Sequence, residues 1–282
     1  MPEVVVHIGA SHTQTAFLHA ALARSSSLAP TGSVQSVPHL AGAGPEEVEQ
    51  FLRGCPIPPS RVVLVVRDLQ RHLPILWTQH ALDAGGSTFQ EYVTELEHDR
   101  QHDTTRWRAI DAARALQPWS RQLGPECIHV VTVPAAPGNL SQLWQRFATA
   151  CGVDAERLDV AAVEARSPKP MPAAAPPHVV GDWTPIDVAL WSDPRVARWS
   201  DDVRDRLATT DYVVHGDLDE LAPRTADASD DVQLDAAVDL LRALVQVAVA
   251  SSPSGPSSAP GSRPARAKDL ARSLRNRLRG NR

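Results

Sequence analysis

The chain has 282 residues, of which 43% are hydrophobic and 22% charged, so it can bury a large core and is not a disordered chain. No apolar run reaches the roughly 18 residues of a membrane-spanning helix, and the start lacks the basic, apolar pattern of a signal peptide. Three widely spaced cysteines without a CxxC pair argue against a disulfide framework or zinc ribbon. We therefore expect a cytoplasmic protein without a transmembrane segment.

The charge is distributed unevenly along the chain. Residues 251–282 contain eight of the 28 Lys and Arg residues and one of the 33 Asp and Glu residues. Residues 1–250 contain more acidic than basic residues, and their net negative charge makes nucleic acid an unexpected partner. We expect residues 1–250 to form one α/β domain, and residues 251–282 to be a Ser/Pro/Gly linker with a basic tail. Such a tail suits contact with an anionic surface or with the acidic domain.

Short apolar and β-branched runs predict strands at 4–8, 61–66 and 128–133, and 212–215 is a fourth candidate strand. Apolar residues at helical spacing predict helices from about residue 17, from 45, from 69, within 86–123, over 140–151 and over 232–250, whereas 25–45 and 165–177 predict loops. Strands that alternate with helices favour a three-layer α/β/α domain with a central parallel sheet. Ligands of such sheets bind beyond the carboxyl ends of the strands, here near residues 9–15, 67–68 and 216–217.

The loop after the first predicted strand has the composition of an anion site. Gly9 is followed by small polar residues and a helix start, so that backbone N–H groups and the helix N-terminus can face a phosphate. The loop lacks the Gly-Lys-Ser/Thr ending of a nucleotide-triphosphate P-loop. A tight strand-to-helix connection without a ligand also explains the pattern.

Residues 6–18, VHIGASHTQTAFL, resemble the 5′-phosphosulfate-binding loop of PAPS-dependent sulfotransferases, which runs from a strand through His-x-Gly and Pro-Lys-Thr-Gly-Thr-Thr into a helix. Residues 65–77 resemble the strand and helix by which that family binds the 3′-phosphate, and 128–133, 143–147 and 216–221 are similar to later segments of bacterial members. The resemblance implies a sulfotransferase or nucleoside-kinase-like fold, PAPS and PAP as co-substrate and product, a small-molecule or glycan acceptor, and no metal. The phosphate-binding residues that it implies are Ser11, His12, Thr13, Gln14, Thr15 and Arg67.

The chain departs from the family pattern at several of these positions. His12 stands where the family has a lysine, Gln14 where it has a glycine, Ala16 where it has the second threonine, and Ile75 where it has a serine. The chain's two lysines, at 169 and 268, lie in no motif that could replace the missing one. Two functions therefore stay open. One is sulfuryl transfer to a hydroxyl or amine, with a protonated His12 in the lysine's role; the other is a catalytically inactive descendant that binds a ligand or partner.

Other polar residues allow both functional and structural interpretations. His80, one turn after Leu76, is a candidate general base or a half-buried helix histidine. His98 and His102 form either a two-histidine metal pair or a solvated helix face. Asp217 and Asp219 suit a metal-binding carboxylate pair, but the spacing of Asp217 and Glu220 is also that of a capping box. The candidate catalytic residues are thus His12 and His80.

Overall fold

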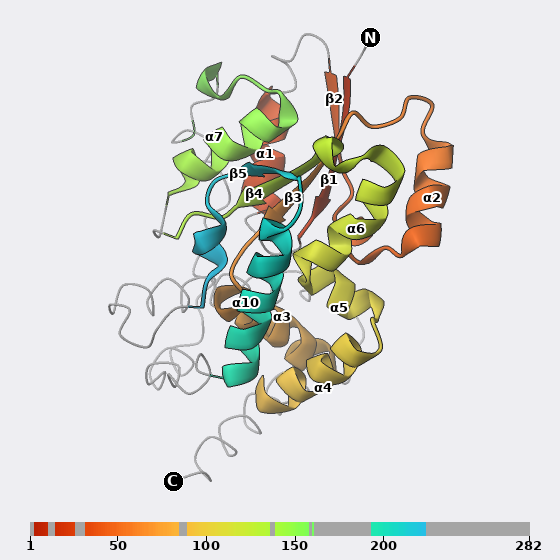
Figure 1. Cartoon of the computed structure of the whole chain (residues 1–282). Coiled ribbons are helices and arrows are strands. Elements are labelled where there is room, and N and C mark those ends of the chain that lie inside the picture. The colour runs from red at the N-terminus through yellow and green to blue at the C-terminus, as the bar shows by residue number, and fades with distance from the viewer. Residues whose placement is uncertain are drawn as a thin grey trace, which may run out of the picture.

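The computed structural model describes residues 3–10, 15–25, 32–84, 89–135, 139–157, 160 and 193–223. These residues build a five-stranded sheet in the order β2-β1-β3-β4-β5, in which every neighbouring pair is parallel (Figure 1). Its strands are β1 (Glu3–Gly9), β2 (Gly32–Ser36), β3 (Arg61–Val66), β4 (Ile128–Thr132) and β5 (Val213–His215). The predicted α/β class with a parallel sheet is confirmed. The predicted helix over 232–250, the predicted loop at 165–177 and the basic tail lie outside the described residues.

Strand β2 lies in the segment that the sequence predicts as a loop, so that prediction is wrong for residues 32–36. The strand is Gly-Ser-Val-Gln-Ser and has one apolar residue, Val34, which packs partly buried against the core. Among the described strands it lies at the edge of the sheet, where it pairs with β1. A strand in this position buries little surface, so it lacks the apolar run that marks the inner strands.

Alternate residues of the strands face opposite sides of the sheet, and each side has its own apolar core. In β3, Val62, Leu64 and Val66 face one cluster, while Val63 and Val65 face the other. Helices α1 (Thr15–Ser25) and α7 (Leu140–Cys151) cover the second side. Helices α2 (Pro45–Gly54), α6 (Ala112–Leu123) and α10 (Pro194–Ala208) cover the first (Figure 1).

A third cluster joins helices beyond the carboxyl ends of the strands. It brings together α3 (Leu69–Ala84), α4 (Phe89–Gln101), α5 (Thr105–Ile110) and the first half of α10, with Trp107 and Trp199 in edge-to-face contact. Helix α4 lies within the segment 86–123 that the sequence predicts as helical, and its apolar residues Phe89 and Leu96 are buried in this cluster. No helix within the described ranges combines the length and apolar character needed to cross a bilayer.

Two histidines are buried within the sheet. His7 is fully buried in β1, where its Nδ1 lies 2.8 Å from the Ser36 hydroxyl and its ring packs edge-on against Phe147. Burial lowers the pKa of His7 from 6.5 to about 4. His129 in β4 lies with Nδ1 2.9 Å from Nε2 of His215, and burial, with His215 next in importance, lowers its pKa to about 4 as well.

We expect the free energy of unfolding to fall as the pH falls from about 6.5 to about 4. The unfolded chain protonates His7 near pH 6.5 but the folded chain only near pH 4, so acid favours the unfolded state across this window. For His7 alone the loss between about pH 7 and 5 is roughly 1 to 2 kcal/mol. Urea unfolding at stepped pH measures it. His7→Asn keeps a donor near Ser36 and should flatten the profile; an unchanged slope in that variant contradicts the assignment.

Candidate anion-binding site

The connections of the sheet reverse direction between β1 and β3. The chain passes from β1 to β2 on one side and from β3 to β4 and β5 on the other. In this doubly wound order, ligands bind outside the carboxyl ends of the strands at the point of reversal. The site is therefore expected where β1 and β3 end, which is where the turn after Gly9 and residues Arg67 and Asp68 lie.

The turn after β1 is held against β3. Gly9 has a φ of 123°, which side-chain-bearing residues rarely adopt, and the Ala10 N–H donates to the Val65 carbonyl at 3.0 Å. Helix α1 then begins at Thr15, with its N-terminus at the same edge. The predicted site residues Ser11, His12, Thr13 and Gln14 lie outside the described residues, as does the Thr15 side chain.

Three charged residues lie buried where β3 leads into α3. Asp68 is fully buried, while Arg67 and Arg71 are less than one tenth exposed. The Asp68 carboxylate accepts from Nε of Arg71 and from the Arg71 backbone N–H, the latter at 2.9 Å. The same arginine reaches the end of β4, where its Nη1 donates to the Pro134 carbonyl at 3.2 Å. Arg71 thus ties the ends of two strands to the first turn of α3.

Arg71 brings a buried donor to this cluster that its bonds to Asp68 and Pro134 leave unused. Nη2 of Arg71 is buried and has no hydrogen-bond partner within the described ranges. An unsatisfied buried guanidinium donor costs free energy, which an anionic oxygen would recover. The N-termini of α1 and α3 add positive potential at the same edge. The edge therefore favours a phosphate, sulfate or carboxylate group.

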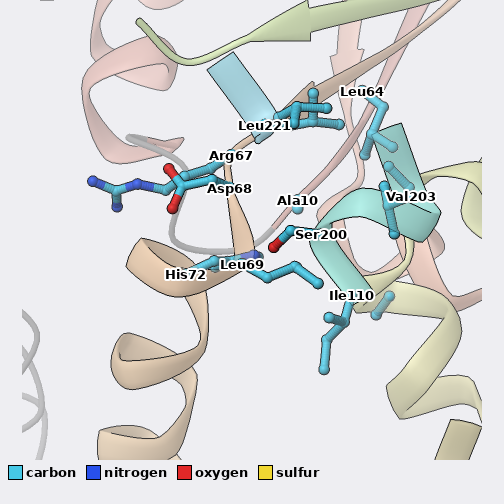
Figure 2. Close-up of a pocket in the computed structure, with 13 residues that line it drawn as sticks. Ala10, Leu64, Arg67, Asp68, Leu69, His72, Ile110, Ser200, Val203 and Leu221 are labelled. Atoms are coloured by element: carbon cyan, nitrogen blue, oxygen red, sulfur yellow. The ribbon is translucent and has the colours of Figure 1, made fainter. Parts of the chain in front are cut away.

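A cavity of about 20 Å³ lies behind this cluster, between the strand ends and α5, α6 and α10 (Figure 2). The buried polar residues His72 and Ser200 line it together with the ends of β1 and β3. Its volume suits about one water molecule and is far too small for a nucleotide. In Figure 2 the side chains of Arg67 and Asp68 extend away from the apolar lining residue Ile110. A larger ligand must therefore bind on the outer side of these residues.

The ends of β4 and β5 carry an ion pair of their own. Arg146 of α7 donates from Nη1 and Nη2 to the two carboxylate oxygens of Glu220, at 2.6 and 3.1 Å, and Nη1 also donates to the Thr132 hydroxyl at 3.0 Å. That hydroxyl donates to Glu220 at 2.5 Å. Burial alone would raise the pKa of Glu220, but the bonds from Arg146 and Thr132 outweigh it and hold the pKa below its usual value.

These contacts correct the predicted capping box. Asp217 does cap the short helix at Leu218–Leu221, but its side chain accepts from the Asp219 N–H, at 2.9 Å. Glu220 points to Arg146 instead of back to residue 217. Within the described ranges, no three His, Cys, Asp or Glu side chains are grouped as a metal site.

His80 lies apart from the anion site. It is 11 residues into α3 from Leu69, roughly 16 Å along the helix axis from the strand ends. Its Nε2 lies 3.3 Å from the Glu95 carboxylate of α4, and its ring packs against Tyr92. His80 therefore lies between helices α3 and α4, whereas Arg67 lies at the strand ends.

Arg71 is the residue of the site that sequence reasoning missed. The only signal was an acid at the end of a strand with an arginine three residues on, a pair typical of any helix start. No family model, curated protein or solved structure was found to match the chain.

Proposed function

We propose that the protein binds a phosphorylated nucleotide at this edge and transfers a sulfuryl group from PAPS to a hydroxyl or amine acceptor. The observation that carries the proposal is the hydrogen bond of the Ala10 N–H to the Val65 carbonyl, because it fixes the point from which the phosphosulfate-like segment continues, at the end of β3 and at the reversal point of the sheet. The choice of PAPS as the ligand rests on the resemblance of residues 6–18 and 65–77 to the phosphate-binding segments of sulfotransferases.

In this reaction the acceptor oxygen or nitrogen attacks the sulfur in line with the leaving phosphate. A new bond to sulfur forms, the sulfur–oxygen bond to the 5′-phosphate breaks with its electron pair, and PAP departs. The acceptor proton passes to a general base, which must lie within hydrogen-bond reach of the acceptor. His80 is the candidate from the sequence, but it lies roughly 16 Å along α3 from the strand ends. Positioning and charge stabilisation dominate such transfers. Arg67 would hold a phosphate, and His12 would offset the charge that develops on the leaving oxygen.

The second candidate function is binding without catalysis. Two substitutions favour it, because His12 is shorter than lysine and Gln14 replaces a residue with far greater backbone freedom. Both candidates keep the phosphate site, so PAP binding tests what they share, whereas turnover separates them.

We expect the full-length chain to bind PAP in a calorimetric titration and to bind adenosine, which has no phosphate, much more weakly. Arg67→Ala should weaken PAP binding by roughly 1.5 to 3 kcal/mol, about tenfold to a hundredfold, if its guanidinium bonds a phosphate. Arg71→Lys, which keeps a cation beside Asp68 but loses the planar fork, should also weaken it.

Arg53→Ala is the matched control, since Arg53 is an exposed arginine of α2 whose ion pair with Glu49 measures 4.0 Å. Its PAP affinity should equal that of the unmodified chain. Absence of PAP binding at millimolar concentration, or equal losses in all three variants, would contradict the proposed site.

A further inference from the structure

Two histidines that the proposed function does not use lie one turn apart at the C-terminal end of α4. The rings of His98 and His102 are stacked, with their centroids 4.1 Å apart and their planes at 28°. Both residues are exposed. Residues four apart on a helix lie on one face, so two imidazoles are presented together to solvent.

The tautomer of His102 follows from its hydrogen bonds. The carbonyl of His98 accepts from the backbone N–H of His102 at 3.2 Å and lies 2.8 Å from its Nδ1. A carbonyl oxygen can only accept, so Nδ1 of the neutral ring carries the proton and Nε2 keeps its lone pair. Metal-binding histidines are commonly oriented in this way, by donating the other ring N–H to a backbone carbonyl.

The neighbouring carboxylates are already engaged. Asp99 is bound by Nε of Arg106, and Asp103 accepts from Arg108 and Arg114 at 3.2 and 2.6 Å. The His98 ring makes no hydrogen bond with any described residue. A cation at this place would therefore meet two imidazole nitrogens and otherwise solvent.

We propose that His98 and His102 bind one divalent transition-metal ion, with water in the remaining coordination positions. Imidazole is a good ligand for copper, nickel and zinc, and Cu²⁺ binds most tightly among these ions at a given nitrogen site. Metal–nitrogen bonds of about 2.0 to 2.1 Å require the two rings to turn from their stacked arrangement toward a common point. Exposed side chains can make this small rotation.

A bound ion would also fasten the corner between α4 and α5. This corner turns at Asp103, a residue with a φ of 49°, and the Thr104 N–H donates back to the Asp99 carbonyl at 3.1 Å. The folded helix end holds both rings on one face, whereas the unfolded chain rarely brings them together in this arrangement, so the ion should raise the melting temperature.

The test is a calorimetric titration of the full-length chain, without an added histidine tag, with Cu²⁺ and with Zn²⁺. His98→Ala removes one ligand. His102→Asn removes Nε2 but keeps an amide donor for the His98 carbonyl, so the helix end is preserved. His39→Ala, at an exposed histidine of another segment, is the matched control. The melting temperature of each variant without metal establishes that it is folded.

We expect Cu²⁺ to bind more tightly than Zn²⁺, and each ligand variant to lose at least roughly tenfold in Cu²⁺ affinity, the lower end of what disturbing a metal site costs. The melting temperature should rise with Cu²⁺ in the unmodified chain and in His39→Ala, and rise clearly less in the two ligand variants at the same Cu²⁺ concentration. Equal Cu²⁺ affinity in the unmodified chain and both ligand variants would overturn the proposal.

Discussion

Replacing His12 with lysine and Gln14 with glycine in the same chain should raise the rate of PAP release from PAPS by about a hundredfold or more. The lysine supplies a cation that stays protonated over the working pH range, and the glycine restores the backbone freedom that the resembling loop uses. The two changes belong together, because an ammonium group displaced by about an ångström can lose roughly a hundredfold in rate.

The assay follows PAP release with a panel of hydroxyl and amine acceptors for the unmodified chain, His12→Ala and the double variant. If imidazolium replaces the lysine, activity of the unmodified chain should fall as the pH rises and His12 loses its proton, and the double variant should show a flatter profile. Turnover in the unmodified chain that His12→Ala leaves unchanged would contradict a catalytic role for His12. Turnover in the double variant alone would identify a descendant that binds without catalysis.

The inner strands could be predicted from the sequence because a strand buried on both faces consists of a continuous run of apolar and β-branched residues. The runs at 4–8 and 61–66 match β1 and β3 to within a residue at most ends, and Ile128 begins β4 as expected. Strand β2 could not be predicted, because its sequence is mostly small and polar and lacks a run of apolar residues. In composition it resembles the loop segments on either side of it. The strand order also had to come from the structure, because apolar runs do not say which strands are neighbours.

The candidate site could be predicted only where it is local in sequence. Arg67 follows a buried run directly, so its place at a strand end was visible. Arg71 acts through the Pro134 carbonyl, 63 positions away, and that contact depends on β3 and β4 being adjacent. His80 was expected near the edge of the site from its position one turn after Leu76. The sequence does not show the direction of α3, which runs away from the strand ends and brings this histidine against Glu95 and Tyr92 of α4.

Gly216 at the end of β5 should be among the positions least tolerant of a side chain, and Gly216→Ala should lower the free energy of unfolding by at least about 3 kcal/mol. Its φ is 124°, and an added Cβ would lie 2.0 Å from the Thr132 hydroxyl and 2.8 Å from Nη1 of Arg146. The hydroxyl cannot move aside cheaply, because it bonds Glu220, Arg146 and the Asp217 N–H within a partly buried network.

Gly54→Ala separates this effect from the general change of glycine to alanine. Gly54 is the last residue of α2, and an added Cβ there meets nothing within 4 Å. Alanine is favoured over glycine by up to about 1 kcal/mol in a helix, so this variant should be neutral or slightly more stable. Thermal and urea unfolding of both variants measure the contrast, and for a domain of this size a loss of about 3 kcal/mol lowers the melting temperature by roughly 6 to 12 °C. Equal stability of the two variants would mean that the Thr132, Arg146 and Glu220 network rearranges freely. The strand ends would then be too pliable to hold the charged groups of the site in place.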